Sequence, residues 1–220
     1  MAARHFTPEY LERAELRDGT WVRLRLVRPE DKAILRAGFA SFSAESRYAR
    51  FLGPKSALSD DELRYLTEVD HEDHLALGAT RDDEHGQPIG LAIARFIKLP
   101  DRHAMAEAAI AVADEAQQRG LGKLMFLRLC AAAAERGIER FHCELLGSNT
   151  GMQKLLEHVA PDRTMESAGG VTTIELVLPE VTPTDPPTRS APDNAMYRLF
   201  RAAAENAVDW TEAVRNLWRR

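Results

Sequence analysis

The sequence of 220 residues contains little cysteine, no long apolar run and no excess of basic charge. Its two cysteines, Cys130 and Cys143, are too few for a disulfide framework, and both lie in apolar segments typical of a protein core. Three acidic residues stand where a signal peptide would have its apolar segment: Glu9, Glu12 and Glu15. No stretch approaches about 18 consecutive apolar residues. We therefore expect a cytoplasmic protein without a membrane partner.

The charge and the distribution of metal-ligand residues exclude two further classes. A formal net charge of −5 argues against a general nucleic-acid partner, which would usually carry a basic surface. Five metal-ligand residues follow one another in Asp70-His71-Glu72-Asp73-His74, but the side chains of consecutive residues point in different directions. We therefore interpret this run as a polar approach to a strand and expect no metal site. The length suits one domain of ordinary size with an appendage.

Two familiar phosphate-binding motifs are incomplete around Gly120 and Gly122. A dinucleotide-binding loop needs a third glycine where Met125 stands, and a Walker A loop needs glycine and serine or threonine where Gln117 and Leu124 stand. What is present is Gln117-x-x-Gly120-x-Gly122, between a short apolar strand and a long apolar helix. Glycines there let the backbone approach a ligand, and unpaired helical N–H groups bind an anion such as a pyrophosphate. An ordinary strand-to-helix turn is the alternative interpretation.

The remaining pattern predicts an α/β (α+β) domain built on a mixed sheet. The charged first 15 residues predict a tail or a short packed helix. Residues 16–178 predict a strand, helices, an antiparallel meander of three strands, the glycine loop and a βαβ crossover. The expected strands are 21–27, 75–80, 89–99, 108–112, 138–146 and 171–178, and the expected helices begin near residues 29, 59, 121 and 151.

The C-terminal part differs in composition from the domain. Residues 179–193 are rich in proline and predict an extended linker. Residues 194–220 carry apolar side chains at helical spacing, including Trp210 and Trp218, and predict an amphipathic helix. Docking of this helix on its own domain, a homodimer contact and a cover over the active cleft remain alternatives, because such an apolar face needs a partner.

The order of these elements and several short motifs resemble the GNAT superfamily of N-acetyltransferases, and within it the bacterial protein-lysine acetyltransferase branch. The resemblance covers residues 16–178 and leaves out the linker and the C-terminal helix. It is carried by these motifs: Arg28-Pro29-Glu30-Asp31, Ser46-Arg47-Tyr48-x-Arg50-Phe51, Asp70-His71, Ala106-Glu107, Gln117 to Gly122, Arg136-Gly137-Ile138 and Ser148-Asn149.

The resemblance implies a site for acetyl-CoA between two splayed parallel strands. It places the pantetheine along Ile110, Ala111 and Val112. The backbone of the loop would then bind the pyrophosphate, through Gln117, Gln118, Arg119, Gly120, Leu121, Gly122 and Lys123, with Asn149 as a side-chain contact further along. The Lys123 side chain either adds a contact with the phosphates or faces solvent.

The resemblance also singles out Glu107 as the catalytic base. Amide formation needs a neutral amine, whereas a free lysine has a pKa of about 10.4 and is charged at neutral pH. We expect the apolar neighbours of Glu107 to desolvate its carboxylate and favour its protonated form, so that it accepts that proton. The alternative is a glutamate of an edge strand that faces solvent. No general acid is assigned, because residues 151–159 lack tyrosine and His158 is only near the expected position.

These features lead to one main functional hypothesis. We expect an acetyl-CoA-dependent N-acetyltransferase that transfers acetyl directly to a primary amine, most plausibly a protein lysine. Acidic residues in the segments 70–73 and 82–84 would suit a cationic acceptor. The alternatives are a small-amine acetyltransferase and a CoA-binding sensor or interaction module without catalysis.

Overall fold

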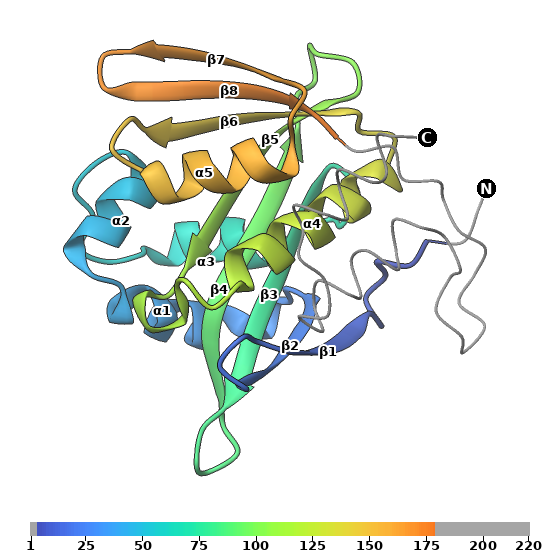
Figure 1. Ribbon diagram of the computed structural model, residues 1–220. Coiled ribbons are helices and arrows are strands. Elements are labelled where there is room, and N and C mark those ends of the chain that lie inside the picture. Colours follow the sequence, from blue (N-terminus) through green and yellow to red (C-terminus); the bar gives the residue numbers. More distant parts are fainter. Residues whose placement is uncertain (1–3, 179–220) are drawn as a thin grey trace.

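The computed structural model describes residues 4–178, which form one mixed sheet with helices on both faces (Figure 1). The strands follow the order β1-β2-β3-β4-β5-β6-β8-β7 across the sheet. Their bounds are β1 Leu11–Glu15, β2 Trp21–Leu26, β3 His74–Asp82, β4 Pro88–Lys98, β5 Met105–Val112, β6 Arg140–Leu146, β7 Arg163–Ala168 and β8 Val171–Val177. The predicted linker 179–193 and helix 194–220 lie outside the described residues.

The helices divide between the two faces of the sheet. Figure 1 shows α4 and α5 on one face and α1, α2 and α3 on the other. Their bounds are α1 Lys32–Ser41, α2 Ala44–Phe51, α3 Asp60–Thr67, α4 Leu121–Ala134 and α5 Thr150–Val159, with short 3-10 turns η1 Pro29–Asp31 and η2 Asp114–Ala116. The predicted capping box of α3 is present, because Ser59 and Glu62 each accept a hydrogen bond from the other's backbone N–H.

The predicted meander and crossover are both confirmed. Strand β4 pairs antiparallel with both β3 and β5, which gives the meander. Helix α4 then connects β5 to β6, which is parallel to β5. Helix α4 is apolar on nearly all sides and is buried over most of its length, as expected for a helix at the centre of a core. Gly90 marks an irregular register between β3 and β4, and a Cβ there would lie 3.1 Å from Ile34 Cγ2 of α1.

The prediction of a tail or helix over the first 15 residues is wrong for the described part. Residues 11–15 form strand β1 and pair antiparallel with β2. Phe6 and Tyr10 are buried, and the Glu12 carboxylate forms an ion pair with Arg128 of α4 at 2.6 Å. The charged residues of this segment hid its packing, since Glu12 is held inside by an arginine more than 100 residues away in the sequence.

The sequence pattern also missed strand β7. It pairs with β8 through a tight turn at Gly169 and Gly170, both of which have positive φ. Five of the six residues of β7 are exposed, so the strand shows no alternation of apolar and polar residues. It lies at the edge of the sheet, where one neighbouring strand is enough to hold it.

Candidate active site

The strands β5 and β6 separate after a short stretch of parallel pairing. Their register covers only Met105–Glu107 against Arg140–His142, although β5 runs on to Val112 and β6 to Leu146. An open cavity lies where they diverge, with an empty volume of about 510 Å³ that includes its open side. It is lined from both strands and from α2, α4 and α5, by residues that include Ala49, Arg50, Ala108, Ala109, Ile110, Leu129, Cys143, Leu145, Asn149 and Met152. We call this space the strand gap.

Backbone groups of β5 face the strand gap at alternate residues. The N–H of Ala113 donates to the carbonyl of Leu91 on β4 at 2.8 Å. Successive N–H groups of a strand point to opposite sides, so Val112 and Ile110 direct theirs toward the gap. The carbonyl of Val112 also faces away from β4, because it accepts a hydrogen bond from Gln117 Nε2 at 3.2 Å. Two residues of the strand can therefore pair with an extended ligand.

The backbone of Ala111, which lies between Ile110 and Val112, does not face the strand gap. By the same alternation its backbone pairs with β4, and its side chain lines a cavity on the opposite face of the sheet. Of the three β5 residues expected along the cofactor, the structure therefore brings Ile110 and Val112 to the gap. The two-residue period of the strand instead directs the backbone of Ala111 to β4.

The predicted glycine loop connects β5 to α4 at the end of the gap. Gln118 and Gly120 adopt positive φ values of 59° and 91°, and α4 begins at Leu121. The first N–H groups of a helix have no partner in the preceding turn, so Leu121 and Gly122 can present theirs to an anion. Leu121 is buried and offers only its backbone, while Lys123 is half-buried. The loop thus has the form expected of a phosphate-binding turn.

Side chains of the loop hold it to its surroundings. Arg119 forms an ion pair with Asp18 at 2.5 Å, and its carbonyl accepts from the N–H of Arg17 at 3.3 Å. Gln117 bonds to Val112 and to Asp114 Oδ1, the latter at 3.1 Å, whereas Gln118 is exposed. The polar side chains of Gln117 and Arg119 therefore shape the loop, which leaves its backbone as the ligand-binding part.

Asp114 connects the loop to helix α2. Its carboxylate accepts hydrogen bonds from the N–H of Ser43 at 2.6 Å and from the hydroxyl of Ser46. Burial acts to raise the pKa of Asp114, but these hydrogen bonds outweigh it and the pKa is lowered. The carboxylate is thus held ionised between the α2 N-terminus and the loop.

Asn149 has a structural role beside its position in the gap. Its Oδ1 accepts from the N–H of Met152 at 3.1 Å and caps the N-terminus of α5. The residue also lines the strand gap, as expected of a contact further along the cofactor. The capping bond fixes the orientation of its amide.

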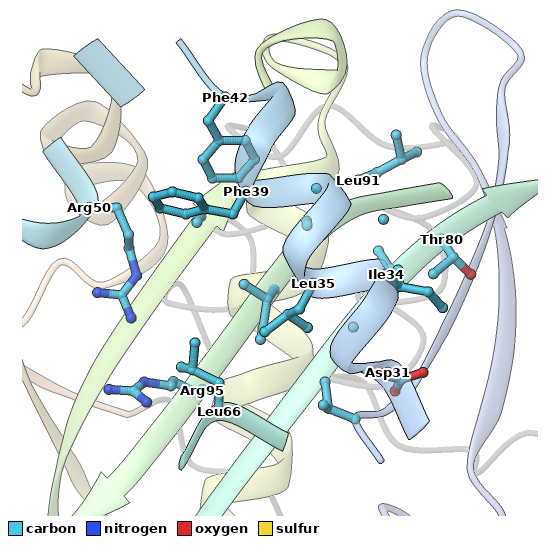
Figure 2. Close-up of a pocket in the computed structure, with 18 of the residues that line it drawn as sticks. Asp31, Ile34, Leu35, Phe39, Phe42, Arg50, Leu66, Thr80, Leu91 and Arg95 are labelled. Carbon is cyan, nitrogen blue, oxygen red and sulfur yellow. The ribbon is translucent and has the colours of Figure 1, made fainter. Parts of the chain in front are cut away.

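A second cavity lies on the other face of the sheet, beneath α1 (Figure 2). Its empty volume is about 850 Å³, including the open side, and we call it the α1 cavity. Most of its lining is apolar and comes from α1, α2, β3, β4 and β5. Arg50 and Ala109 line both this cavity and the strand gap. The two spaces therefore meet at these residues.

Glu107 lies where β5 and β6 begin to diverge. It pairs with Ile97 on β4 and with His142 on β6, and it shares a face of β5 with Ala109. Its side chain is exposed, so the desolvation expected from its apolar neighbours is wrong. The reason is the two-residue period of the strand: Ala106 and Ala108 point to the opposite face and do not surround Glu107.

The sequence pattern assigns no role in the site to Tyr65, His74 or Arg95, which lie near Glu107 across the sheet. The guanidinium of Arg95 lies 4.9 Å from the centre of the Tyr65 ring. The ring of His74 also lies against Tyr65, with 5.2 Å between the two ring centres. Burial, supported by the charge of Arg95, lowers the pKa of His74 to about 4. An arginine and a histidine inside otherwise apolar strands were the available signal. Their proximity depends on pairing across the sheet, which sequence spacing does not show.

The acidic segments 70–73 and 82–84 do not form a common rim. They lie at opposite ends of β3, whose nine residues span about 30 Å. Asp70 accepts three backbone hydrogen bonds within its own turn, and Asp73 pairs with Lys98 at 2.8 Å. Glu72 and Asp82 also form ion pairs, with Arg4 and Arg23. Three of the six acidic residues are thus paired locally, and the structure does not bring the two segments together at one place.

Within residues 4–178, no group of three His, Cys, Asp or Glu side chains is placed to hold a metal ion. None of the described helices has the length and apolar character needed to cross a membrane. Cys130 and Cys143 are buried, and burial raises the pKa of both thiols, that of Cys143 to about 12.

Comparison with known proteins agrees with this geometry. The model of the acetyltransferase (GNAT) family matches residues 39–160. The acetyltransferase Pat of Mycolicibacterium smegmatis is 32% identical over 196 residues, which are 87% of this chain and 56% of the relative. The chain therefore spans about half the length of that protein.

Solved structures show the same architecture. The GNAT domain of S. lividans PAT superposes with a TM-score of 0.70 at 29% identity, covering 79% of this chain and 99% of that domain. The yncA protein of Salmonella typhimurium, a putative acetyltransferase solved with acetyl-CoA, shares the fold with a TM-score of 0.56 at 17% identity, over 74% of this chain and 98% of that one. The predicted family and fold class are thus confirmed, and this chain belongs to the acetyltransferase (GNAT) family.

Proposed function

We propose that this chain transfers an acetyl group from acetyl-CoA directly to a primary amine, and that the amine is a protein lysine side chain. The observation that carries the proposal is the strand gap, which meets the glycine loop at one end and the α1 cavity at Arg50 and Ala109. One extended ligand and one acceptor can enter from opposite faces of the sheet and meet there. The similarity to the acetyltransferase Pat and to the GNAT domain of PAT supports acetyl transfer, and the motifs that resemble the protein-lysine acetyltransferase branch support a protein acceptor.

The residues present fit acetyl-CoA. The backbone groups of Ile110 and Val112 suit the amides of a pantetheine arm, and the N-terminus of α4 suits a pyrophosphate. The structure of yncA with acetyl-CoA supports the same cosubstrate. When bound, acetyl-CoA supplies an activated acetyl thioester; the chain has to orient it and manage the proton of the amine.

Glu107 is the carboxylate that we assign to this proton. It lies two residues before Ala109 on the same face of β5, and Ala109 lines both the strand gap and the α1 cavity. Because Glu107 is exposed, it can exchange protons with solvent as well as accept one from an ammonium group. The amine nitrogen then forms the bond to the acetyl carbon, the carbon–sulfur bond breaks, and CoA leaves as a thiolate; the nitrogen loses its second proton to solvent, and the thiolate takes up a proton from water. We assign neither cysteine a covalent role, since both are buried with raised pKa values.

The test compares acetyl transfer by the wild type, Glu107→Gln and a matched control, Glu166→Gln. Glu166 is also an exposed strand glutamate but lies on the distant edge strand β7. We expect transfer to protein lysines to fall by about 100-fold or more in Glu107→Gln and to be unchanged in the control. Binding of CoA, measured by calorimetry, should be equal in all three proteins.

Three outcomes would contradict parts of the proposal. Equal transfer by both variants would remove Glu107 as the base. Transfer to polyamines but to no protein would identify a small-amine acetyltransferase. CoA binding without transfer to any amine would favour a CoA-binding sensor.

A further inference from the structure

Two arginines line one end of the α1 cavity without an anionic partner. Arg50 comes from α2 and Arg95 from β4, and Figure 2 shows both guanidinium groups on the same side of α1. Among residues 4–178 neither forms an ion pair or a hydrogen bond; Nη1 of Arg95 is buried without a partner. Their close contacts are with rings: Arg50 lies 5.2 Å from Phe51 and Arg95 4.9 Å from Tyr65.

The other charges of this cavity do not compensate these cations. Arg25 and Asp31 line it as well, but they pair with each other at 2.6 Å, and Asp31 also accepts from the N–H of Arg28. Glu107 acts on Arg50 only at a distance and forms no ion pair with it. Burial and the charge of Arg95 lower the pKa of Arg50 to about 10. Both arginines are half-buried, and a cation with a buried, unpartnered nitrogen such as Nη1 of Arg95 is unfavourable, so this end of the cavity is suited to an anion.

We infer that Arg50 and Arg95 form an anion subsite that binds a carboxylate of the acceptor, next to the amine that receives the acetyl group. The inference rests on the proposed acetyl transfer, because it takes the α1 cavity as the acceptor side. Guanidinium groups match a carboxylate in planar, bidentate geometry, which also fixes its orientation. Arg50 lines both spaces, so a carboxylate bound there lies close to the point where they meet.

The position of the pair separates it from the loop that suits the pyrophosphate. Arg95 is paired with Ala109, whereas the loop begins after Val112 at the end of β5. At about 3.3 Å per residue, this places the subsite roughly 10 Å from the start of the loop, and Arg95 points to the other face of the sheet. The phosphates of the cosubstrate therefore have their own site, and the anion of this subsite belongs to the acceptor.

A carboxylate next to a primary amine can come from two sources. In a protein it is an acidic residue adjacent to the target lysine; in a small molecule it is the carboxylate of a free amino acid. Two matched pairs of acceptors distinguish them. The first is a lysine peptide with aspartate or asparagine beside the lysine, and the second is free lysine against cadaverine, which lacks the carboxylate.

The experiment measures kcat/KM for both pairs with the wild type, Arg95→Gln, Arg95→Lys and the control Arg64→Gln. Arg64 is an exposed arginine of α3 that pairs with Asp61 outside the cavity. We expect the wild type to prefer the carboxylate-bearing member of at least one pair by about tenfold, mainly through KM. Arg95→Gln should lose this preference, Arg95→Lys should keep part of it, and Arg64→Gln should keep all of it.

Each outcome decides the inference. A preference within the peptide pair identifies the protein source, and one within the second pair identifies the free amino acid. Transfer without any preference, or a preference that survives in Arg95→Gln, overturns the subsite and leaves the proposed function intact. If Arg95→Gln does not fold, the wild-type preference and Arg95→Lys decide.

If no amine is acetylated, the proposed function fails and calorimetric binding of the same four acceptors takes over. Preferential binding of the carboxylate-bearing members would support the subsite without catalysis. Equal binding within both pairs would overturn it.

Discussion

Replacing Glu12 by glutamine tests whether the N-terminal segment is part of the folded domain. The Glu12 carboxylate accepts hydrogen bonds from Nε and Nη2 of Arg128, each at 2.6 Å, and one from the hydroxyl of Tyr10. The Arg128 side chain is only 5% exposed and that of Glu12 23%. Burial acts to raise the pKa of Glu12, but the hydrogen bonds and charge of Arg128 outweigh it, so the pKa is lowered.

The expected loss of stability follows from this geometry. Breaking a buried ion pair by removing one partner costs about 3–5 kcal/mol. Glutamine keeps one acceptor oxygen and the site is partly exposed, so we expect about 2–3 kcal/mol for Glu12→Gln. For a domain of this size that corresponds to a fall in Tm of about 5–10 °C. Thermal unfolding followed by circular dichroism measures it.

The control is Glu15→Gln, because Glu15 lies on the same strand but is exposed. Its stability should stay within about 0.5 kcal/mol of the wild type. A lowered folded-state pKa stabilises at pH values above the ordinary value of 4.5, and this contribution disappears as the pH falls through the folded-state pKa. The difference between wild type and Glu12→Gln should therefore shrink in acid. Equal Tm values for both variants at pH 7 would refute the packing of this segment.

Three further predictions concern the site and the core. Gly120→Ala should lower the free energy of unfolding by about 1–2 kcal/mol, because position 120 has a φ of 91°, and should also weaken CoA binding. Gly137→Ala is the control: its φ is 72° but it lies far from the loop, so it should lower Tm and leave CoA binding in calorimetry unchanged. His74, with a pKa of about 4 against 6.5 when unfolded, should stay neutral in NMR titrations down to about pH 4, and its contribution to stability should fall as the pH decreases between those values; a midpoint near 6.5 would contradict this. Cys143, whose pKa burial raises to about 12, should react with Ellman's reagent at pH 8 only after unfolding, and rapid modification of the native protein would contradict its burial.

The elements that the sequence predicts well are those whose local pattern matches their burial. The strand before the glycine loop and helix α4 are indicated by the length of their apolar runs, and helix α3 by its capping box. The two missed strands lack such a local signal for different reasons. Strand β7 is exposed at the edge of the sheet, and β1 is stabilised partly by the contact of Glu12 with Arg128, which no local pattern contains.

In the candidate site, too, some features follow from the local sequence and others depend on neighbouring strands. The glycine loop depends on backbone conformation, which glycine at position 120 indicates directly. The environment of Glu107 depends on side chains of neighbouring strands, and its own neighbours along the chain point to the other face. Arg95 and His74 become relevant only because β3 and β4 pair in a register that brings them near Tyr65. Such cross-strand neighbours are the part of a site that a single sequence cannot supply.

Helix α2 joins the two halves of the site. At its N-terminus Ser43 and Ser46 bond to Asp114 beside the glycine loop, and near its C-terminus Arg50 lines both the strand gap and the α1 cavity. These points are about 10 Å apart along the helix, at 1.5 Å per residue. Helix α2 therefore links Asp114, beside the glycine loop, to the residue at which the strand gap and the α1 cavity meet.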